Sequence, residues 1–156
     1  MSVEIRTLAR SELGALAKLH AACFPADAWT VRDFIELLAI RGAGGHVATA
    51  PRSGIVGFII DIVSDDAEIL TLGVTPDQRR AGIARALIDH LTRRARAKGA
   101  QRILLEVAAD NYAAIRLYED KGFRMLGERP GYYRRPEGNT DAYIFGFSLT
   151  GSTEQT

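Results

Sequence analysis

The feature that most constrains the fold is a long amphipathic segment between two strand-like runs. From about residue 80 to residue 98, apolar side chains recur at helical spacing, namely Ala84, Leu87, Ile88, Leu91 and Ala95. Gly99 marks the C-terminal end of this helix. The run RILLEVA at 102–108 is almost continuously apolar, as in a strand covered on both faces, and it follows a helix of crossover length. Residues 69–107 therefore predict a βαβ unit with parallel strands.

The rest of the chain predicts antiparallel strands around this unit. Three β-rich runs within 45–74 are separated by turn residues, which favours an antiparallel meander. A strand at 3–9 and two strands at the end of the chain complete a set of seven. Helical spacing predicts two helices before the meander, the second capped by Thr30, and one after RILLEVA, capped by Asp110 or Asn111. We expect an α/β (α+β) fold with a mixed, mostly antiparallel seven-stranded sheet and about four helices.

Length, cysteine content and hydrophobicity narrow the class of protein. A chain of 156 residues with 47% hydrophobic residues can bury one core of ordinary size, so we expect one domain over 1–150 and a polar, disordered tail over 151–156. The single cysteine, Cys23, argues against a disulfide framework and a cysteine-based zinc cluster, which fits a reducing cytoplasm. The sequence has no run of about 18 apolar residues and no signal-peptide pattern, so we expect neither a membrane span nor secretion.

The segment QRRAGIARAL at 78–87 is the first candidate binding site. It occupies the strand-to-helix turn of the βαβ unit, where unpaired N–H groups and the positive end of the helix dipole favour an anion. Gly82 would let the backbone approach a phosphate closely. The segment lacks the Gly-Lys-Ser/Thr of a Walker loop and the three glycines of a dinucleotide-binding loop, which argues against an NTPase and an NAD enzyme.

Charge is concentrated in the same region. Residues 79–98 carry seven basic side chains against Asp89 alone, although the net charge of the chain is only +1. The basic residues near the end of the helix are explained by the helix dipole, whereas Arg79, Arg80 and Arg85 are equally compatible with an anionic ligand. Because the net charge is low, we expect no general affinity for nucleic acid.

The second candidate site is LLEVAADNYAAIRLYEDKGF at 104–123. Glu106 interrupts an apolar strand, and a carboxyl group with a raised pKa in a cleft is a candidate general base. Strand alternation also allows Glu106 to face outward at an opening of the sheet. Tyr118 shares a helix face with Ala114 and Ile115, so packing is its default role, but its phenol would reach a leaving group at the strand end. The residues alone leave both alternatives open.

Taken together, these motifs resemble the GNAT superfamily of acetyl-CoA-dependent N-acetyltransferases. The Q/R-x-x-G-x-G/A loop of that family matches residues 79–84 at every defined position, and the resemblance extends over about 3–149. The run at 105–123, followed by GYY at 131–133 and DAY at 141–143, is similar to the RimI-type branch, bacterial enzymes that acetylate the N-terminal alanine of a small-subunit ribosomal protein. FPADAWT at 24–30 is similar to the acceptor-side loop of that branch.

The resemblance implies a role for individual residues. Glu106 is implied to be the general base and Tyr118 the general acid. Backbone pairing with the pantetheine of acetyl-CoA is implied for Leu72, Gly73 and Val74. Pyrophosphate binding is implied for Arg79, Arg80, Ala81, Gly82, Ile83 and Ala84. Further cofactor contacts are implied for Asn111 and Tyr118, and acceptor contacts for Phe24, Trp29, Tyr132, Tyr133 and Tyr143. No metal is implied.

Packing is the alternative for several of these residues. The tyrosines are also explained by strand packing, and Trp29 by a hydrophobic staple with Phe34 at the start of a helix. The histidines, His20, His46 and His90, are expected to be isolated from one another, in surface or packing roles.

Three functions follow from the resemblance. The first is acetylation of a protein N-terminal α-amine, on a ribosomal protein with N-terminal alanine, by a cytoplasmic enzyme that is a monomer or weak dimer and does not bind nucleic acid directly. The second keeps the fold and takes a small amine as acceptor. A polycationic amine would favour an acid-rich pocket, and Asp27, Asp65 and Asp66 are too scattered in the sequence to argue one. The third function is a non-catalytic module that binds CoA or the ribosome.

Overall fold

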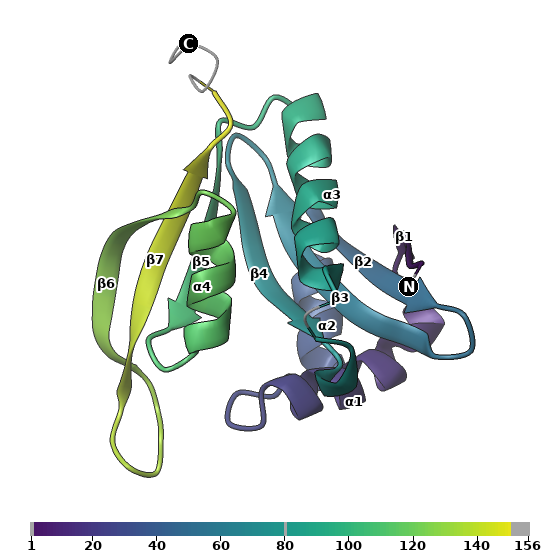
Figure 1. Ribbon diagram of the computed structural model, residues 1–156, viewed down its shortest axis with the longest axis horizontal. Helices are drawn as coiled ribbons and strands as arrows, with labels where there is room; N and C mark the ends of the chain where they lie inside the picture. Colours follow the sequence, from purple (N-terminus) through teal and green to yellow (C-terminus); the bar gives the residue numbers. More distant parts are fainter. Residues whose placement is uncertain (1, 80, 151–156) are drawn as a thin grey trace.

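A twisted seven-stranded sheet organises the computed structural model, which describes residues 2–79 and 81–150 (Figure 1). The strand order is β1-β2-β3-β4-β5-β7-β6, and β4 and β5 form its parallel pair. The strands are β1 (Glu4–Thr7), β2 (Ala43–Ala50), β3 (Gly54–Val63), β4 (Ala67–Val74), β5 (Arg102–Ala108), β6 (Arg124–Tyr133) and β7 (Thr140–Ser148). The mixed, mostly antiparallel sheet with a central βαβ unit is thus confirmed.

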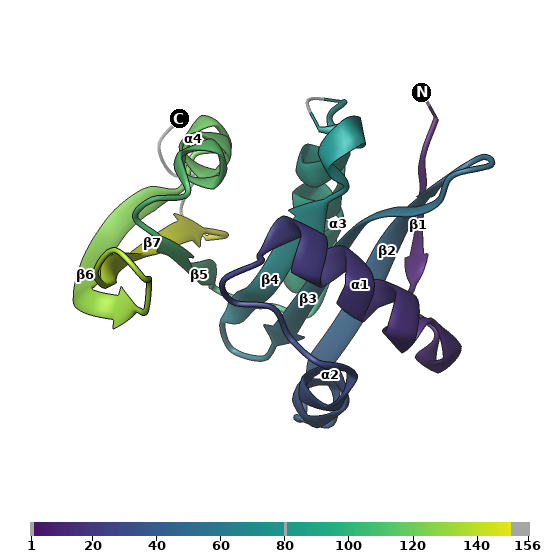
Figure 2. The ribbon, with the colours of Figure 1, turned by 90° about the horizontal axis from the view of Figure 1, so that it is seen from below.

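Four α-helices cover the two faces of this sheet, as predicted. They are α1 (Leu13–Cys23), α2 (Val31–Leu38), α3 (Ile83–Ala97) and α4 (Tyr112–Asp120). Short 3₁₀ turns lie at Arg10–Glu12 and Pro76–Gln78. Figure 2 shows α1 and α2 on one side of the strands β2–β4 and α3 on the other. Among the described residues, no helix combines the length and hydrophobicity that crossing a membrane requires.

The helix starts follow from local sequence. The Thr30 hydroxyl accepts a hydrogen bond from Asp33 N–H at 3.1 Å, and the Asp33 carboxylate accepts one from Thr30 N–H at 2.8 Å, which completes a capping box. Asn111, one of the two predicted caps, begins α4 by accepting from Ala114 N–H at 3.2 Å. α3 begins at Ile83 rather than near residue 80, because Gly82 holds a left-handed conformation (φ 80°) directly before it.

A β-bulge separates β4 from β5 halfway along their length. The two strands pair only at Ala67, Glu68 and Ile69 of β4. Directly after this, the register between β3 and β4 shifts, so that Leu70 has no partner opposite it. An extra residue increases local twist and bends the strand. The bulge therefore turns the second half of β4 away from β5, and the sheet divides into two arms (Figure 1).

Each face of the sheet has its own hydrophobic core. Under α3 and α4, the first core contains residues such as Leu87, Leu91, Ile103, Tyr118 and Phe145. Under α1 and α2, the second core contains residues such as Leu16, Phe34, Val47, Phe58 and Ile60. Because side chains alternate along β5, Leu105 and Val107 enter the first core and Glu106 points to the opposite face, toward α1 and α2.

Candidate active site

An open strand edge lies at the divided end of the sheet. Thr75 N–H donates to Val56 O at 2.8 Å, and Val74 is opposite Gly57, so the backbone groups of Val74 point away from β3. By the same alternation along the strand, the backbone N–H and C=O groups of Leu72 point away from β3, and those groups of Gly73 point toward β3. The Val74 carbonyl accepts from Cys23 Sγ at 3.3 Å and from Arg79 Nε at 3.2 Å. The N–H of Val74 thus remains the group available to a ligand in the gap.

Gly73 meets a packing requirement rather than a hydrogen-bonding one. A Cβ atom at this position would lie 2.6 Å from Cζ of Phe58 and 3.1 Å from Sγ of Cys23. No side chain fits there unless both neighbours move. Of the three residues predicted to pair with pantetheine, Leu72 and Val74 therefore present backbone groups to the gap, and Gly73 brings β4 close to Phe58.

The turn before α3 presents backbone N–H groups at the same end of the sheet. The first helical bond runs from Ala86 N–H to Gly82 O at 3.0 Å, so the N–H groups of Ile83, Ala84 and Arg85 are outside the helical ladder. Nothing lies within 4 Å of the position that a Cβ of Gly82 would occupy. Gly82 is thus needed for its positive φ and leaves open space above the helix N-terminus.

The arginines of this turn differ in what they contact. Arg79 bonds the Val74 carbonyl and so ties the turn to the end of β4. Arg85 lies 3.5 Å from the carboxylate of Asp120, at the end of α4. Arg80 lies outside the described residues. Together with an ion pair between Asp89 and Lys121, the Arg85 contact connects the two arms of the sheet on the α3 and α4 side.

Glu106 lies one residue beyond the last β4–β5 pair, at the point where the strands separate. Its side chain is 27% exposed, and Arg129 Nε lies 2.8 Å from Oε2. This oxygen is buried and makes no aligned hydrogen bond within the described part of the chain. The carboxylate is therefore accessible through its other oxygen, and the half-exposed guanidinium of Arg129 balances its charge.

Tyr118 lies on the other face of β5 from Glu106. It is 6% exposed, and its ring packs against Phe123 with centroids 5.5 Å apart. Burial raises the pKa of its phenol well above the usual value, and the nearby Tyr133 adds to this shift. Within the described residues the Tyr118 hydroxyl has no hydrogen-bond partner. Tyr118 therefore fills the core with its ring and keeps a protonated hydroxyl that a ligand can accept from.

Tyr133 lies near both Glu106 and Tyr118. Burial raises its pKa to about 12, with contributions from the negative charges of Glu106 and Asp27. The ring of Tyr132 packs edge-on against it with centroids 5.1 Å apart. By contrast, Tyr143 is opposite Val107 and packs into the core under α3 and α4, on the other face from Glu106. The charge of Glu106 thus acts on Tyr133, whereas Tyr143 lies on the other face of the sheet.

The predicted acceptor residues before α2 surround a buried histidine. His20 is 2% exposed, and its ring centroid lies 4.9 Å from those of both Phe24 and Trp29. His20 Nδ1 accepts from Trp29 N–H at 3.1 Å, and Nε2 lies 3.1 Å from the Thr71 hydroxyl. Burial lowers the pKa of His20 to about 4, so the ring is neutral and holds the loop in place.

The histidines are not all isolated from one another, contrary to expectation. The rings of His46, on β2, and His90, on α3, lie 4.6 Å apart because α3 packs over the strands of the meander. Arg94 donates to His90 Nδ1 at 3.1 Å and pairs with the buried carboxylate of Asp61 at 2.7 Å. Within the described residues, no cluster of three or more His, Cys, Asp or Glu side chains is placed to bind a metal ion.

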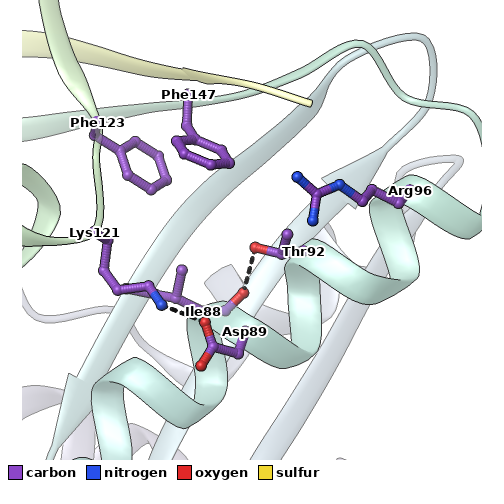
Figure 3. Close-up of a pocket in the computed structure, with 7 residues that line it drawn as sticks. All are labelled: Ile88, Asp89, Thr92, Arg96, Lys121, Phe123 and Phe147. Carbon is purple, nitrogen blue, oxygen red and sulfur yellow. Dashed lines mark hydrogen bonds and ion pairs between the residues drawn. The ribbon is translucent and has the colours of Figure 1, made fainter. Parts of the chain in front are cut away.

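A small pocket lies apart from these residues. It has a volume of about 170 Å³ and is lined by Ile88, Asp89, Thr92, Arg96, Lys121, Phe123 and Phe147. Figure 3 shows Phe123 and Phe147 on one side of the pocket and residues of α3 on the other. None of the predicted site residues lines it.

Two residues near the site were missed by the sequence analysis. Arg129 pairs with Glu106, and Arg135 pairs with Asp27 and Asp110. Arg129 ends the predicted strand FRMLGER, and Arg135 lies in the predicted loop rich in Tyr, Arg, Pro and Gly; neither pattern indicates which carboxylate each arginine meets. Their partners follow only from the strand order, which inserts β7 between β5 and β6.

Comparison with known proteins relates this arrangement to one family. The model of the acetyltransferase (GNAT) family matches residues 13–123. The chain is 38% identical to the ribosomal protein bS18-alanine N-acetyltransferase of Escherichia coli strain K12 over 92 residues, which cover 59% of this chain and 62% of the relative. The match therefore spans less than two thirds of that relative's length.

Solved structures extend the similarity over nearly the full chain. The crystal structure of the ribosomal-protein-S18-alanine N-acetyltransferase from Escherichia coli has a TM-score of 0.86 and 30% identity, with coverage of 95% of this chain and 94% of that one. Arabidopsis thaliana NAA60 in complex with acetyl-CoA has a TM-score of 0.83 and 23% identity, with coverage of 96% and 100%, and shows the shared fold.

Proposed function

Since the chain belongs to the GNAT acetyltransferase family, we propose that it transfers the acetyl group of acetyl-CoA to the N-terminal α-amine of a protein. The acceptor we propose is a ribosomal protein with N-terminal alanine, as the names of its Escherichia coli relatives indicate for those proteins, and the reaction would take place in the cytoplasm. The observation that carries the proposal is the position of Glu106, one residue beyond the last β4–β5 pair, at the point where the two strands separate, with its side chain on the face of α1 and α2.

The divided end of the sheet suits acetyl-CoA as substrate. The open edge of β4 can pair with the amides of pantetheine as an added strand would, and the turn before α3 offers N–H groups and a helix dipole to the pyrophosphate. Asn111 uses its side-chain oxygen as a helix cap, which leaves its NH₂ group for the substrate. The edge and the turn are both at the end of β4, so one extended molecule can contact both.

Glu106 would act as the general base. An α-amine is mostly protonated near neutral pH and attacks a thioester only after it loses a proton. The Glu106 carboxylate faces the side of α1 and α2, where the loop with Phe24 and Trp29 and the ring of Tyr133 would receive the acceptor. It would take the proton directly or through a water molecule. The neutral amine then attacks the carbonyl carbon of the thioester.

Val74 and Tyr118 would assist the following steps. The N–H of Val74 points into the gap and would donate to the oxyanion of the tetrahedral intermediate, which typically contributes about 3 kcal/mol. When the intermediate collapses, its nitrogen loses a second proton to a water molecule, the C–S bond breaks and a thiolate leaves. Because the pKa of an ordinary phenol, about 10, already exceeds that of an ordinary thiol, about 8.5, and burial raises the pKa of Tyr118 further, a hydrogen bond from its hydroxyl to the thiolate is favoured over complete proton transfer.

The small-amine alternative has less support from the charges at the site. A polyamine would need carboxylates that are free to bind cations, and Asp27 and Asp110 are paired with Arg135 while Glu106 is paired with Arg129. The other two carboxylates considered from the sequence, Asp65 and Asp66, lie at the β3–β4 turn, at the far end of β4 from Val74.

A product analysis tests the proposed function. The protein is incubated with acetyl-CoA and peptides that begin with alanine, the same peptides with a blocked N-terminus, and spermidine. We expect mass spectrometry to find one acetyl group on the α-amine of the free peptides and none on the blocked ones. Acetylation of lysine side chains or of spermidine alone would contradict the proposed acceptor.

A further inference from the structure

The side chain of Arg135, in the loop between β6 and β7, is the most constrained cation near the site. It is 14% exposed. Nη1 and Nη2 lie 3.2 and 3.1 Å from the two oxygens of Asp27, and Nε lies 3.2 Å from Asp110 Oδ2. Nη1 also donates to the Arg134 carbonyl at 3.0 Å. All three nitrogens of the guanidinium are therefore engaged, in the two-pronged geometry that arginine forms with a carboxylate.

The partners of Arg135 come from segments that are far apart in the sequence. Asp27 lies between Phe24 and Trp29, in the loop that joins α1 to α2. Asp110 directly precedes Asn111, the cap of α4. Among the described residues, Arg135–Asp27 is the ion pair that joins the α1–α2 loop to the arm formed by β5, β7 and β6. It crosses the gap on the opposite face from the Arg85–Asp120 pair.

Arg135 also contacts Tyr133, the tyrosine whose pKa is raised by the charge of Glu106. Its Cζ atom lies 5.3 Å from the centroid of the Tyr133 ring, within cation–π range. One guanidinium thus contacts both walls of the space in front of Glu106, namely the α1–α2 loop through Asp27 and the β6 strand through Tyr133. Moving Arg135 would move the two walls relative to each other.

We propose that Arg135 is a positioning residue for the acceptor, which fixes the α1–α2 loop against Tyr133 so that the incoming amine is held in front of Glu106. This inference rests on the proposed function. It extends that function because Arg135 does not touch the reacting atoms and acts through Asp27 and Tyr133. The reason is geometric: an amine must be held close to the attack position, and a displacement of about 1 Å is enough to reduce the rate strongly.

Steady-state kinetics of Arg135→Gln test the proposal. We expect the KM for an alanine-initiated peptide to rise about tenfold while the KM for acetyl-CoA changes less than about twofold. Arg135→Lys should restore only part of the peptide affinity, because an ammonium cannot reproduce the two-pronged contact with Asp27. Arg134→Gln is the matched control, since it removes the same charge from the neighbouring exposed residue and should leave both KM values unchanged.

A double-mutant cycle separates positioning from a general loss of stability. Asp27→Asn should raise the peptide KM to a similar extent, and the double variant Asp27→Asn/Arg135→Gln should be no worse than either single variant. Additive effects, or equal changes in the KM values of peptide and acetyl-CoA, would overturn the proposal. Acetyl-CoA binding by each variant confirms that it is folded.

Hydrogen exchange gives a readout that does not depend on activity. We expect amide exchange in residues 24–30 to be faster in Arg135→Gln than in the parent protein, and unchanged in Arg134→Gln. If the parent acetylated no amine, the proposed function would fail while this measurement still reported on the contact. Unchanged exchange in residues 24–30 of Arg135→Gln would show that Arg135 does not hold the loop.

Discussion

The two sides of the gap between β4 and β5 are built in different ways. The side that we assign to acetyl-CoA consists mainly of backbone: the open edge of β4, the turn at Gly82 and the N-terminus of α3. The side that we assign to the acceptor consists of side chains from four segments, including Trp29, Glu106, Tyr133 and Arg135. A backbone site depends on local conformation, so one contiguous motif specifies it. A side-chain site depends on long-range packing, and substitutions should affect the two sides differently.

The largest effect is expected from Glu106→Gln. Removing the proposed base should lower kcat for peptide acetylation by about a hundredfold or more and flatten the rise of the rate with pH, while acetyl-CoA affinity stays close to that of the parent protein. Titration with acetyl-CoA reports on the acetyl-CoA side, and a pH profile of the rate reports on the acceptor side, where Glu106 lies. Glu128→Gln, on the exposed edge strand β6, is the control and should behave like the parent. If the pH profile of Glu106→Gln were the same as that of the parent, Glu106 would not be the general base.

Acidification should destabilise the packing around His20 on the acceptor side. The folded-state pKa of His20 is about 4 against an ordinary value of 6.5, so its contribution to stability is complete above about pH 6.5 and is lost as the pH falls toward 4. This pKa shift of His20 corresponds to a change of about 3 kcal/mol in the free energy of unfolding. Protonation also removes the Nδ1 lone pair that accepts from Trp29 N–H. Because Trp29 is the single tryptophan, its fluorescence during urea unfolding at pH 7 and pH 4.5 reports this change directly.

His20→Gln provides the comparison for this measurement. The variant should be less stable than the parent at pH 7, and its stability should depend less on pH between 6.5 and 4. His46→Gln is the comparison, because burial also lowers the pKa of His46 to about 4: it should reduce the pH dependence of stability as well, but leave the fluorescence of folded Trp29 unchanged, since His46 lies under α3. Equal pH dependence in the parent and in His20→Gln would argue against the role of His20.

A smaller effect is expected from Tyr118→Phe. The substitution keeps the ring packed against Phe123 and removes one hydrogen bond to the leaving thiolate, so kcat should fall about tenfold. Acetyl-CoA binding and the melting temperature should stay near the parent values. Stopped-flow detection of the released thiol measures the rate. If turnover were unchanged, Tyr118 would be a packing residue only.

The smallest effect, and the one confined to the acetyl-CoA side, is expected from Gly82→Ala. Gly82 and Gly99 flank the two ends of α3, and both have φ near 80° with no atom within 4 Å of the position that a Cβ would occupy. Alanine at either site should cost about 1 kcal/mol of stability because of the left-handed conformation. Only Gly82→Ala should also weaken acetyl-CoA binding, by a few-fold, and calorimetry compares the two. If Gly82→Ala and Gly99→Ala bound acetyl-CoA with equal affinity, the pyrophosphate would not bind at this turn.

The difference between local conformation and long-range packing also explains which features could be predicted from the sequence. The βαβ unit, the antiparallel meander and the caps at Thr30 and Asn111 depend on periodicity and local hydrogen bonds, and the structure confirms them. The contacts of Arg129 and Arg135 depend on the order β5-β7-β6, and the position of Tyr143 on the face away from Glu106 depends on the register with Val107. No local pattern contains this information. Arg80 and the predicted tail at 151–156 lie outside the described residues.

The bulge at Leu70 has a consequence for the solubility of the fold. Opening a sheet exposes unpaired backbone groups, and such an edge normally invites pairing with a strand of another molecule and aggregation. Here the open edge of β4 faces inward, and ion pairs cross the gap on both faces, Arg85–Asp120 on one and Arg135–Asp27 on the other. Between these ion pairs the edge would pair with a single extended chain that carries amide groups, as we propose for pantetheine. The bulge at Leu70 therefore gives the protein an open strand edge that lies in the middle of the sheet and not at its rim.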